Sequence, residues 1–407
     1  MGASSKTNRD ETSDTKNFLL DIVLKSFKSG RNNYKSSRWL TAFKQRLILI
    51  SPIRADWVRG VHMSLLPQRK SLLHLGAKLL RVCFLSVLIA SFVPTQSMAG
   101  VVRQDEAKLA QQVGLPVYEW KSDSVEPQAV AILVHGLTMH GAVYDKLARH
   151  LADQGYIVLA PDLHGYGRWV DAPSEKRHCK ECGAQVCYQK SRRELVGLVD
   201  SVKETYPSLP LYMIGESLGA DMVLYSVGQR PKAVEGIVLS SPAIKRRLNM
   251  VPRVFWDVSL LTHNLYRQVN LIPYMKKFAS EDPRIIEEAV HDPLVRKRMT
   301  TWELFKTIQT IKPTLGYAEK VPADMPVLVI QGDKDRMLKT NGVCDLLKHL
   351  NSQNRTVRWF KDRGHLLLET AYLRDDTLST VDGWLKEHLN TGKMVQASVQ
   401  GSIRREL

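Results

Sequence analysis

The chain has 407 residues and a formal net charge of +17, from 58 Lys and Arg against 41 Asp and Glu. Most of the excess lies in two places, because residues 1–99 carry 16 basic and 5 acidic side chains and residues 244–320 carry 14 basic and 8 acidic ones. No recognisable nucleic-acid motif accompanies this charge, which argues against nucleic acid as a partner.

The N-terminal hundred residues have the pattern of a targeting sequence. From Met63 a basic stretch leads into the apolar run Val82 to Val93, and S-M-A precedes Gly100. This is the order of a secretory signal with a small-residue cleavage site. Its apolar core of about 12 residues is short of the roughly 20 that span a bilayer. We expect residues 63–99 to be a signal peptide, or an uncleaved signal anchor, that exports the rest of the chain.

Residues 1–62 form a basic N-terminal extension ahead of this signal. Signal peptides stand at the start of a chain, so we expect that translation begins at Met63 and that the extension is not translated. The alternative is a cytoplasmic tail on a membrane anchor.

The next feature is an apolar run at Ala129 to Val134, which predicts a buried strand. It leads into H-G-L-T-M-H-G at 135–141. We expect His135 and His140 to shape this loop and not to touch a ligand. A second apolar run follows at Tyr156, and a helix is predicted between the two strands at residues 144–154.

A cysteine-rich insertion, H-C-K-E-C-G-A-Q-V-C, occupies residues 178–187. Its three cysteines and His178 have the softness and number of a zinc site. An exported chain favours oxidation instead, so we expect one or two disulfides that fix this loop, with zinc as the alternative. The pairing stays open among the four cysteines that follow the signal: Cys179, Cys182, Cys187 and Cys344.

Ser217 lies at the centre of G-E-S-L-G, which ends an apolar, strand-like stretch in the run Leu211 to Ala220. A G-x-S-x-G turn between a strand and a helix exposes the serine in a strained backbone conformation, and its glycines leave room for the turn. A serine hydroxyl is a poor nucleophile near neutral pH, so it needs a histidine base and a carboxylate that orients the base. On this kind of sheet the acid and then the base follow the serine in the chain.

The regular alternation of strands and helices stops between Ser240 and Pro326. We predict that residues 244–325 are a helical cap inserted into the core, which divides the core into residues 100–243 and 326–407. The apolar side chains of the cap are expected to serve both its own packing and a ligand pocket: Phe255, Trp256, Leu260, Leu261, Leu265, Tyr266, Leu271, Ile272, Tyr274 and Met275.

Candidates for the acid and the base follow this insertion. A strand predicted at Val327 to Ile330 ends just before Asp333 and Asp335, which lie on one loop and are equivalent by sequence physics alone. His365 follows a predicted strand at Thr356 to Phe360, and of the 12 histidines it alone follows both other groups at a strand end.

Strands near residues 129, 156, 211, 236, 327 and 356 alternate with helical runs, which include 191–206 and 377–388. This order predicts an α/β fold, a doubly wound and mainly parallel sheet with the inserted helical cap. The candidate reactive groups all fall at strand C-termini, where such sheets bind ligands.

Several motifs occur in a fixed order: H-G-L-T-M-H-G-A-V-Y, Y-I-V-L-A-P-D-L-H-G-Y-G-R at 156–168, G-E-S-L-G, Q-G-D-K-D-R and G-H-L-L-L-E at 364–369. On these motifs, and on residues 281–295 of the cap, the chain resembles the α/β-hydrolase superfamily. It is most similar to the monoacylglycerol lipase and lysophospholipase group of serine hydrolases. It departs from that group at Leu137, at Glu216, where many relatives have histidine, and at Arg168-Trp169.

The resemblance implies that Ser217 is the nucleophile, His365 the base and Asp335, in preference to Asp333, the orienting acid. The backbone N–H groups of Leu137 and Leu218 would form the oxyanion hole. No cofactor and no metal are implied. We expect an exported serine ester hydrolase acting on a lipid monoester, such as a monoacylglycerol or a lysophospholipid.

Two alternatives remain. A carboxylesterase, thioesterase or acyltransferase of the same fold would have similar motifs. A non-catalytic exported binding protein would use the cysteine-rich loop instead. The basic cap or an N-terminal anchor is also expected to associate with a membrane surface, although such charge often marks only solvated helices.

Overall fold

The computed structural model describes residues 100–173, 179–245 and 266–403, with side chains as far as residue 389. The predicted signal and the extension before it lie outside these ranges. So do His178 and the first five apolar residues named for the cap: Phe255, Trp256, Leu260, Leu261 and Leu265.

One eight-stranded sheet forms the centre, in the order β1-β2-β4-β3-β5-β6-β9-β10. The neighbouring strands β4, β3, β5, β6, β9 and β10 run parallel to one another. At one edge of the sheet, β2 pairs antiparallel with both β4 and β1. The bounds are β1 Val101–Gln104, β2 Val117–Ser122, β3 Ala129–Val134, β4 Tyr156–Pro161, β5 Leu211–Glu216, β6 Gly236–Ser240, β9 Val327–Gly332 and β10 Arg355–Phe360. The fold class predicted from the sequence is confirmed. The β1–β2 pair was not predicted.

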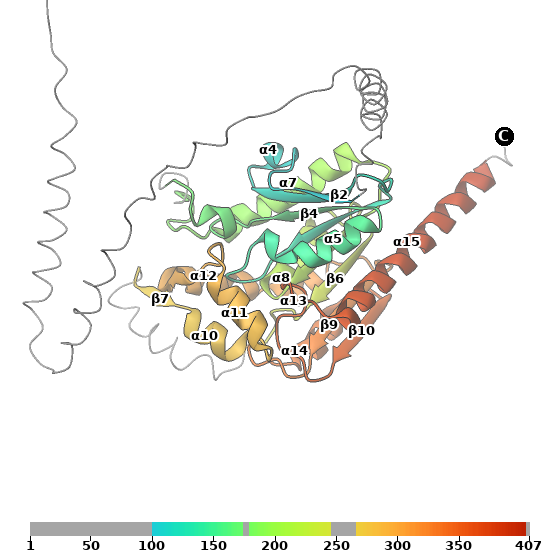
Figure 1. Ribbon diagram of the computed structural model, residues 1–407. Coiled ribbons are helices and arrows are strands. Elements are labelled where there is room, and N and C mark those ends of the chain that lie inside the picture. Colours follow the sequence, from blue (N-terminus) through green and yellow to red (C-terminus); the bar gives the residue numbers. More distant parts are fainter. Residues whose placement is uncertain (1–99, 174–178, 246–265, 404–407) are drawn as a thin grey trace, which may run out of the picture. The chain divides into compact units, whose positions relative to one another are not determined.

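Helices cover both faces of this sheet (Figure 1). One apolar cluster joins the sheet to α7, α8 and α14, and another joins its opposite face to α5 and α15. The strands β3, β5, β6 and β9 are buried along their whole length. Their sequences are therefore nearly continuous apolar runs and show no alternation of polar and apolar residues. The helices of the core are α4 Ala110–Val113, α5 Asp145–Asp153, α7 Tyr188–Thr205, α8 Leu218–Gln229, α14 Gly342–His349 and α15 Asp375–Ile403. The short 3₁₀ turns are η1 Gly141–Tyr144 and η2 Gly167–Trp169.

The sequence predicted the last helix only for residues 377–388, and α15 extends well beyond that point to residue 403. Within the described ranges, no helix combines the length and the apolar character needed to cross a bilayer.

The described part of the cap lies between β6 and β9. It contains α10 Ile272–Phe278, α11 Pro283–His291, α12 Thr301–Ile311 and α13 Thr314–Ala318, and also the strands β7 Gln268–Asn270 and β8 Arg298–Thr300. The predicted cap is thus mainly helical, and it also contains the antiparallel pair β7–β8, which the sequence analysis did not predict. Each strand has three residues and buries only its central side chain, Val269 or Met299, so it is too short to show a strand period in the sequence.

Candidate active site

Ser217 lies in a tight turn between β5 and α8. Its φ of 57° is positive, the strained conformation that a G-x-S-x-G turn predicts. The flanking glycines are sterically required, because a Cβ on Gly219 would collide with the carbonyl oxygen of Val134, and one on Gly215 with the carbonyl of Gly219. The side chain of Ser217 is thereby presented at the C-terminal edge of the sheet.

His365 and Asp335 form a buried pair at the same edge. The Nδ1 atom of His365 lies 2.8 Å from Oδ2 of Asp335. The second oxygen, Oδ1, accepts N–H groups from Met337 and Leu338 at 2.8 Å each, and Gln331 donates to Oδ2 at 3.0 Å. These contacts fix the carboxylate on one side of the imidazole ring.

The electrostatics of this pair suit a base and its orienting acid. Burial opposes ionisation of Asp335, but the neighbouring His365 and the hydrogen-bond donors outweigh it and lower the pKa of Asp335. Burial also disfavours the imidazolium, yet the Asp335 carboxylate outweighs it and raises the pKa of His365 above its ordinary value. His365 is therefore a stronger base than an ordinary histidine.

The structure distinguishes the two candidate aspartates that the sequence left equivalent. Asp333 is exposed, and its backbone N–H donates to Phe360 at the end of β10. Asp335 is fully buried and contacts His365. The sequence could not show this, because the direction of each side chain depends on how the loop after β9 turns.

The predicted oxyanion donors lie on either side of Ser217. Leu218 begins α8, so its N–H has no acceptor within the helix. Leu137 follows Gly136, and a Cβ on Gly136 would lie 3.2 Å from the Cβ of Ser217. The oxyanion loop, residues 135–141, therefore passes directly beside the serine, although the roles of the two amides remain predictions.

His135 and His140 occupy structural positions in the oxyanion loop. His135 is completely buried, and its Nε2 accepts the N–H of Leu163 at 3.0 Å. Burial lowers its pKa to about 4, so the ring is neutral near pH 7. His140 contacts Asp292 of the cap through Nε2 at 2.9 Å. Both side chains hold the loop in place, as the sequence analysis expected.

The cap contacts the core next to the reactive groups. A small apolar cluster joins Met139 of the oxyanion loop and Leu366 of the histidine loop, residues 361–371, to the cap residues Met275, Ala279, Ile285, Ala289 and Val295. Polar contacts reinforce it, since Gly364 donates its N–H to Glu281 at 2.5 Å and Arg296 donates its N–H to Thr138 at 2.8 Å. The cap is thus bonded to both loops that flank Ser217.

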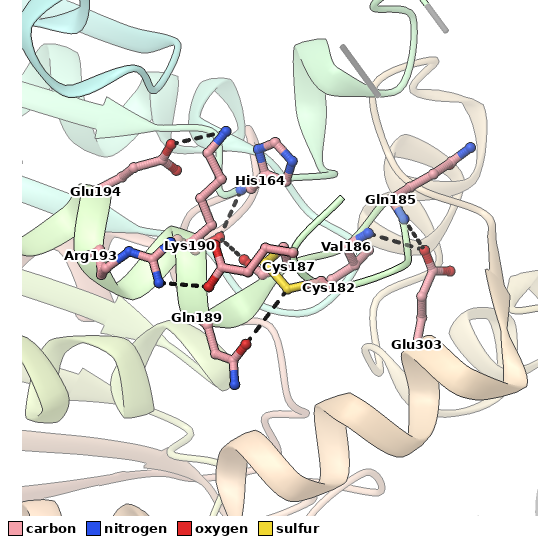
Figure 2. Close-up of a disulfide and its surroundings, with 12 residues drawn as sticks. His164, Cys182, Gln185, Val186, Cys187, Gln189, Lys190, Arg193, Glu194 and Glu303 are labelled. Atoms are coloured by element: carbon pink, nitrogen blue, oxygen red, sulfur yellow. Dashed lines mark hydrogen bonds and ion pairs between the residues drawn. A yellow bond between two sulfur atoms is a disulfide. The ribbon is translucent and has the colours of Figure 1, made fainter. Parts of the chain in front are cut away.

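The cysteine-rich loop connects the core with the cap (Figure 2). Cys182 and Cys187 form a disulfide, whereas Cys179 is buried and free and Cys344 is exposed and free. The N–H groups of Gln185 and Val186 both donate to Oε1 of Glu303 in α12, at 3.1 Å each. One disulfide therefore fixes the loop, within the range that the sequence predicted.

Three cysteine sulfur atoms, two of them joined in the disulfide, lie close together in this loop. The sulfur atoms of Cys179, Cys182 and Cys187 all lie within 4.8 Å of one another. Across the described ranges, this is the only group of three or more His, Cys, Asp or Glu side chains arranged in this way. His178, the fourth ligand considered, is not among the described residues.

The sequence analysis missed the roles of two buried carboxyl groups at this edge. Glu216 is the residue directly before Ser217, and Glu369 is the fourth residue after His365; both are at most 2% exposed. For Glu216 the available signal was an ionisable side chain at the end of an otherwise apolar strand, whereas Glu369 lies in a loop and gave no such signal.

Comparisons with known proteins agree with the fold and show the family. The family model described as serine aminopeptidase, S33, matches residues 125–370. A monoacylglycerol lipase of Mycolicibacterium smegmatis is 24% identical over 281 residues, covering 67% of this chain and 93% of the relative. The phospholipase YtpA of Bacillus subtilis is 27% identical over 262 residues, covering 61% and 91%. The crystal structure of a monoacylglycerol lipase from Paleococcus ferrophilus superposes with a TM-score of 0.53 at 23% identity, covering 67% of this chain and 99% of that one.

Proposed function

This chain belongs to the family described as serine aminopeptidase, S33, and is a lipase-like α/β-hydrolase; we propose that it is an exported serine esterase that cleaves a lipid monoester. The observation that carries the proposal is the buried His365–Asp335 pair, at 2.8 Å, on the same sheet edge as the strained turn of Ser217. Relatives named monoacylglycerol lipase and phospholipase support a glycerol or glycerophosphate monoester as the substrate.

In the proposed mechanism, Ser217 Oγ attacks the ester carbonyl while Nε2 of His365 takes its proton. Asp335 holds the ring through Nδ1 and stabilises the imidazolium. The N–H groups of Leu137 and Leu218 bind the oxyanion. His365 then returns the proton to the leaving alcohol, and a water molecule, activated by the same histidine, hydrolyses the acyl-enzyme.

An acyl chain fits the character of the cap. Beside the carboxylates of Glu281 and Asp292, the cap places an apolar set against the oxyanion and histidine loops, and this set includes Met275, Ile285 and Val295. An acyl chain that reached these apolar side chains would gain about 0.8 kcal/mol for each methylene buried. This supports a lipid ester over a short polar ester.

The outer surface of the cap supports association with a lipid surface. On α12, Trp302 stacks on Phe305 with ring centroids 5.6 Å apart, and Lys306 lies 4.6 Å from the Trp302 ring centre. On α10, Lys276 and Lys277 are exposed. Half-buried aromatic rings beside lysines suit the head-group region of an anionic bilayer. Binding to phosphatidylglycerol vesicles, lost at high salt and weak with phosphatidylcholine alone, would support this placement; equal binding to both vesicle types would contradict it.

Export is supported by the signal-like pattern of residues 63–99. N-terminal sequencing of protein from its natural cell tests this part of the proposal. A chain that begins at Gly100 is expected, and an intact chain that retains residues 1–62 would contradict both cleavage and the internal start at Met63.

The catalytic proposal is tested with a fluorophosphonate probe. We expect labelling of the native protein and none of Ser217→Ala; absence of labelling, or labelling that survives the substitution, would reject the proposal. A panel of chromogenic esters with two to sixteen acyl carbons, then a monoacylglycerol, a lysophospholipid and an aminoacyl anilide, defines the substrate class. Preferential turnover of the anilide would favour a peptidase instead.

A further inference from the structure

Glu216 joins the nucleophile turn to the histidine loop. It is completely buried at the end of β5. Its carboxylate accepts three consecutive backbone N–H groups of that loop and one hydroxyl: Leu367 at 2.9 Å, Leu368 at 3.2 and 3.3 Å, Glu369 at 3.0 Å and Ser240 Oγ at 2.5 Å. Leu367, Leu368 and Glu369 are 151 to 153 positions after Glu216 in the sequence. The Glu216 carboxylate therefore links the turn at Ser217 to the backbone of the histidine loop.

Glu369 joins the histidine loop to the oxyanion loop. Its Oε1 accepts the N–H of Gly136 at 2.5 Å and the hydroxyl of Tyr144 at 3.2 Å. A Cβ on Gly136 would lie 3.3 Å from the other oxygen, Oε2, and 3.2 Å from the Cβ of Ser217. The carboxyl group thus packs against the oxyanion loop at the place where that loop passes the nucleophile.

The two carboxyl groups differ in how far their surroundings raise their pKa. Burial raises the pKa of Glu216, and its four hydrogen-bond donors oppose this change. Burial also raises the pKa of Glu369, the charge of Glu216 raises it further, and only two donors oppose the shift. The pKa of Glu369 is therefore raised more than that of Glu216. Oε1 of Glu369 accepts both hydrogen bonds, whereas the buried Oε2 atom has no hydrogen-bond partner among the described residues.

We propose that Glu216 and Glu369 are positioning residues that hold the oxyanion loop, the nucleophile turn and the histidine loop in one arrangement. The inference rests on the proposed function. Neither side chain touches the substrate; Glu216 keeps His365 in register with Ser217, and Glu369 restricts Gly136 and, through it, the neighbouring N–H of Leu137. Misplacement of a reacting group by about 1 Å costs on the order of a hundredfold in rate, so such restraint affects turnover more than binding.

The charge of Glu216 also acts on His365. The other charged groups near this ring are Asp335 after β9, Arg363 on the same loop, and Glu281 on the cap, which accepts the Gly364 N–H and pairs with Arg363 at 3.3 Å. Glu216 and Asp335 both favour the imidazolium. Because kcat/KM requires neutral His365, it rises with pH through the pKa of this group. Removal of the Glu216 charge lowers that pKa and moves the acid limb to lower pH.

The experiment measures kcat, KM and the pH profile of Glu216→Gln, Glu369→Gln and Glu369→Leu on an ester that the native enzyme hydrolyses. The control is Glu235→Gln, because Glu235 accepts the N–H of Leu211 at 2.6 Å at the opposite end of β5. We expect Glu216→Gln to lower kcat about ten- to a hundredfold with KM within about twofold, and to move the acid limb down by roughly half a pH unit or more. Glu235→Gln should match the native enzyme in both respects.

Glu369 should respond in a different way. Gln is a neutral isostere that retains an acceptor for Gly136 and Tyr144, so Glu369→Gln should keep most of the native kcat and the native acid limb. Glu369→Leu removes the acceptor and should lower kcat about tenfold or more. An equal loss in Glu369→Gln and Glu369→Leu would overturn the role of Glu369 as an acceptor for Gly136 and Tyr144, and native kcat and pH profile in Glu216→Gln would overturn the positioning role of Glu216.

Failure of the proposed function gives a different result. In that case the native protein itself is not labelled by the fluorophosphonate, or Ser217→Ala still is. If native protein is labelled and Glu216→Gln is labelled at the same rate and pH dependence, only the further inference fails. Thermal unfolding of each variant checks folding. If Glu369→Leu does not fold, the positioning role of Glu216 is still tested by the contrast in kcat and acid limb between Glu216→Gln and Glu369→Gln.

Discussion

The sheet core and the cap are held in place by different kinds of contact. In the core, β3, β5 and β9 bury every residue, and apolar clusters cover both faces. The described part of the cap meets the reactive loops through one small apolar cluster and through single hydrogen bonds. The core is therefore specified by continuous packing. The cap shares part of that packing, because Met299, Leu304 and Ala318 belong to the large cluster, but its contacts with the reactive loops depend on individual bonds that a single substitution removes.

The largest expected effect lies in the core. Asp335→Asn should lower kcat by about ten-thousandfold, because an amide cannot both accept from His365 Nδ1–H and keep its other donors. Asp333→Asn, on the same loop but exposed, should change kcat less than about twofold. Single-turnover rates on a chromogenic ester give the comparison. Equal losses in the two variants would show that the loop, and not the Asp335 carboxylate, matters.

Packing gives the next contrast between core and cap. Gly219→Ala places a methyl group against the Val134 carbonyl and should destabilise the protein by about 3 kcal/mol or more. At Gly316, on the exposed side of α13 in the cap, an added Cβ meets nothing within 4 Å. Gly316→Ala should therefore stabilise the cap helix by up to about 1 kcal/mol. Denaturant unfolding followed by circular dichroism measures both; a tolerated Gly219→Ala would contradict the close approach of α8 to β3.

The attachment of the cap can be tested through Glu303. This carboxylate is 1% exposed and lies 3.3 Å from Arg296 Nη2, besides accepting two N–H groups of the cysteine-rich loop. Glu303→Gln leaves the buried Arg296 without its anion, at a cost of about 3 kcal/mol. We expect faster amide exchange in α12 and unchanged protection in β3 and β5.

The matched control on the cap is Glu319→Gln. Glu319 pairs with His349, but the two side chains are 58% and 44% exposed, so the pair contributes little. Exchange in α12 should remain native in this variant. If Glu303→Gln instead lowered protection of the whole sheet equally, the cap and the core would unfold as one unit.

The sequence predicted what depends on local pattern. Six strands were identified as apolar runs, and the position of Ser217 followed from glycines whose necessity the structure explains. The choice between Asp333 and Asp335 did not follow from local pattern, because it depends on one loop turning toward His365. The bonds of Glu216 to the histidine loop escaped prediction for a similar reason, since they join residues that only the folded sheet brings together. Strands as short as β7 and β8 carry too few residues for a period.

The smallest effect concerns the disulfide between Cys182 and Cys187, which lies between the two regions. It closes a loop with a sequence separation of 5, so its loss should cost about 2 kcal/mol or less. Cys182→Ser should loosen the loop and weaken its contact with Glu303, which lowers the thermal midpoint by a few degrees and leaves kcat within about twofold. Reduction of the native protein in denaturant should raise its thiol count by two.

Zinc makes the opposite predictions for the same loop. Bound metal would leave Cys179, Cys182 and Cys187 as thiolates, so the thiol count in denaturant with a chelator would not rise on reduction. Elemental analysis of the purified protein would then find about one zinc per chain. In that case a chelator, and not a reductant, would release the loop from Glu303 and raise exchange in α12. The attachment of the cap would depend on metal supply instead of the redox state of its surroundings.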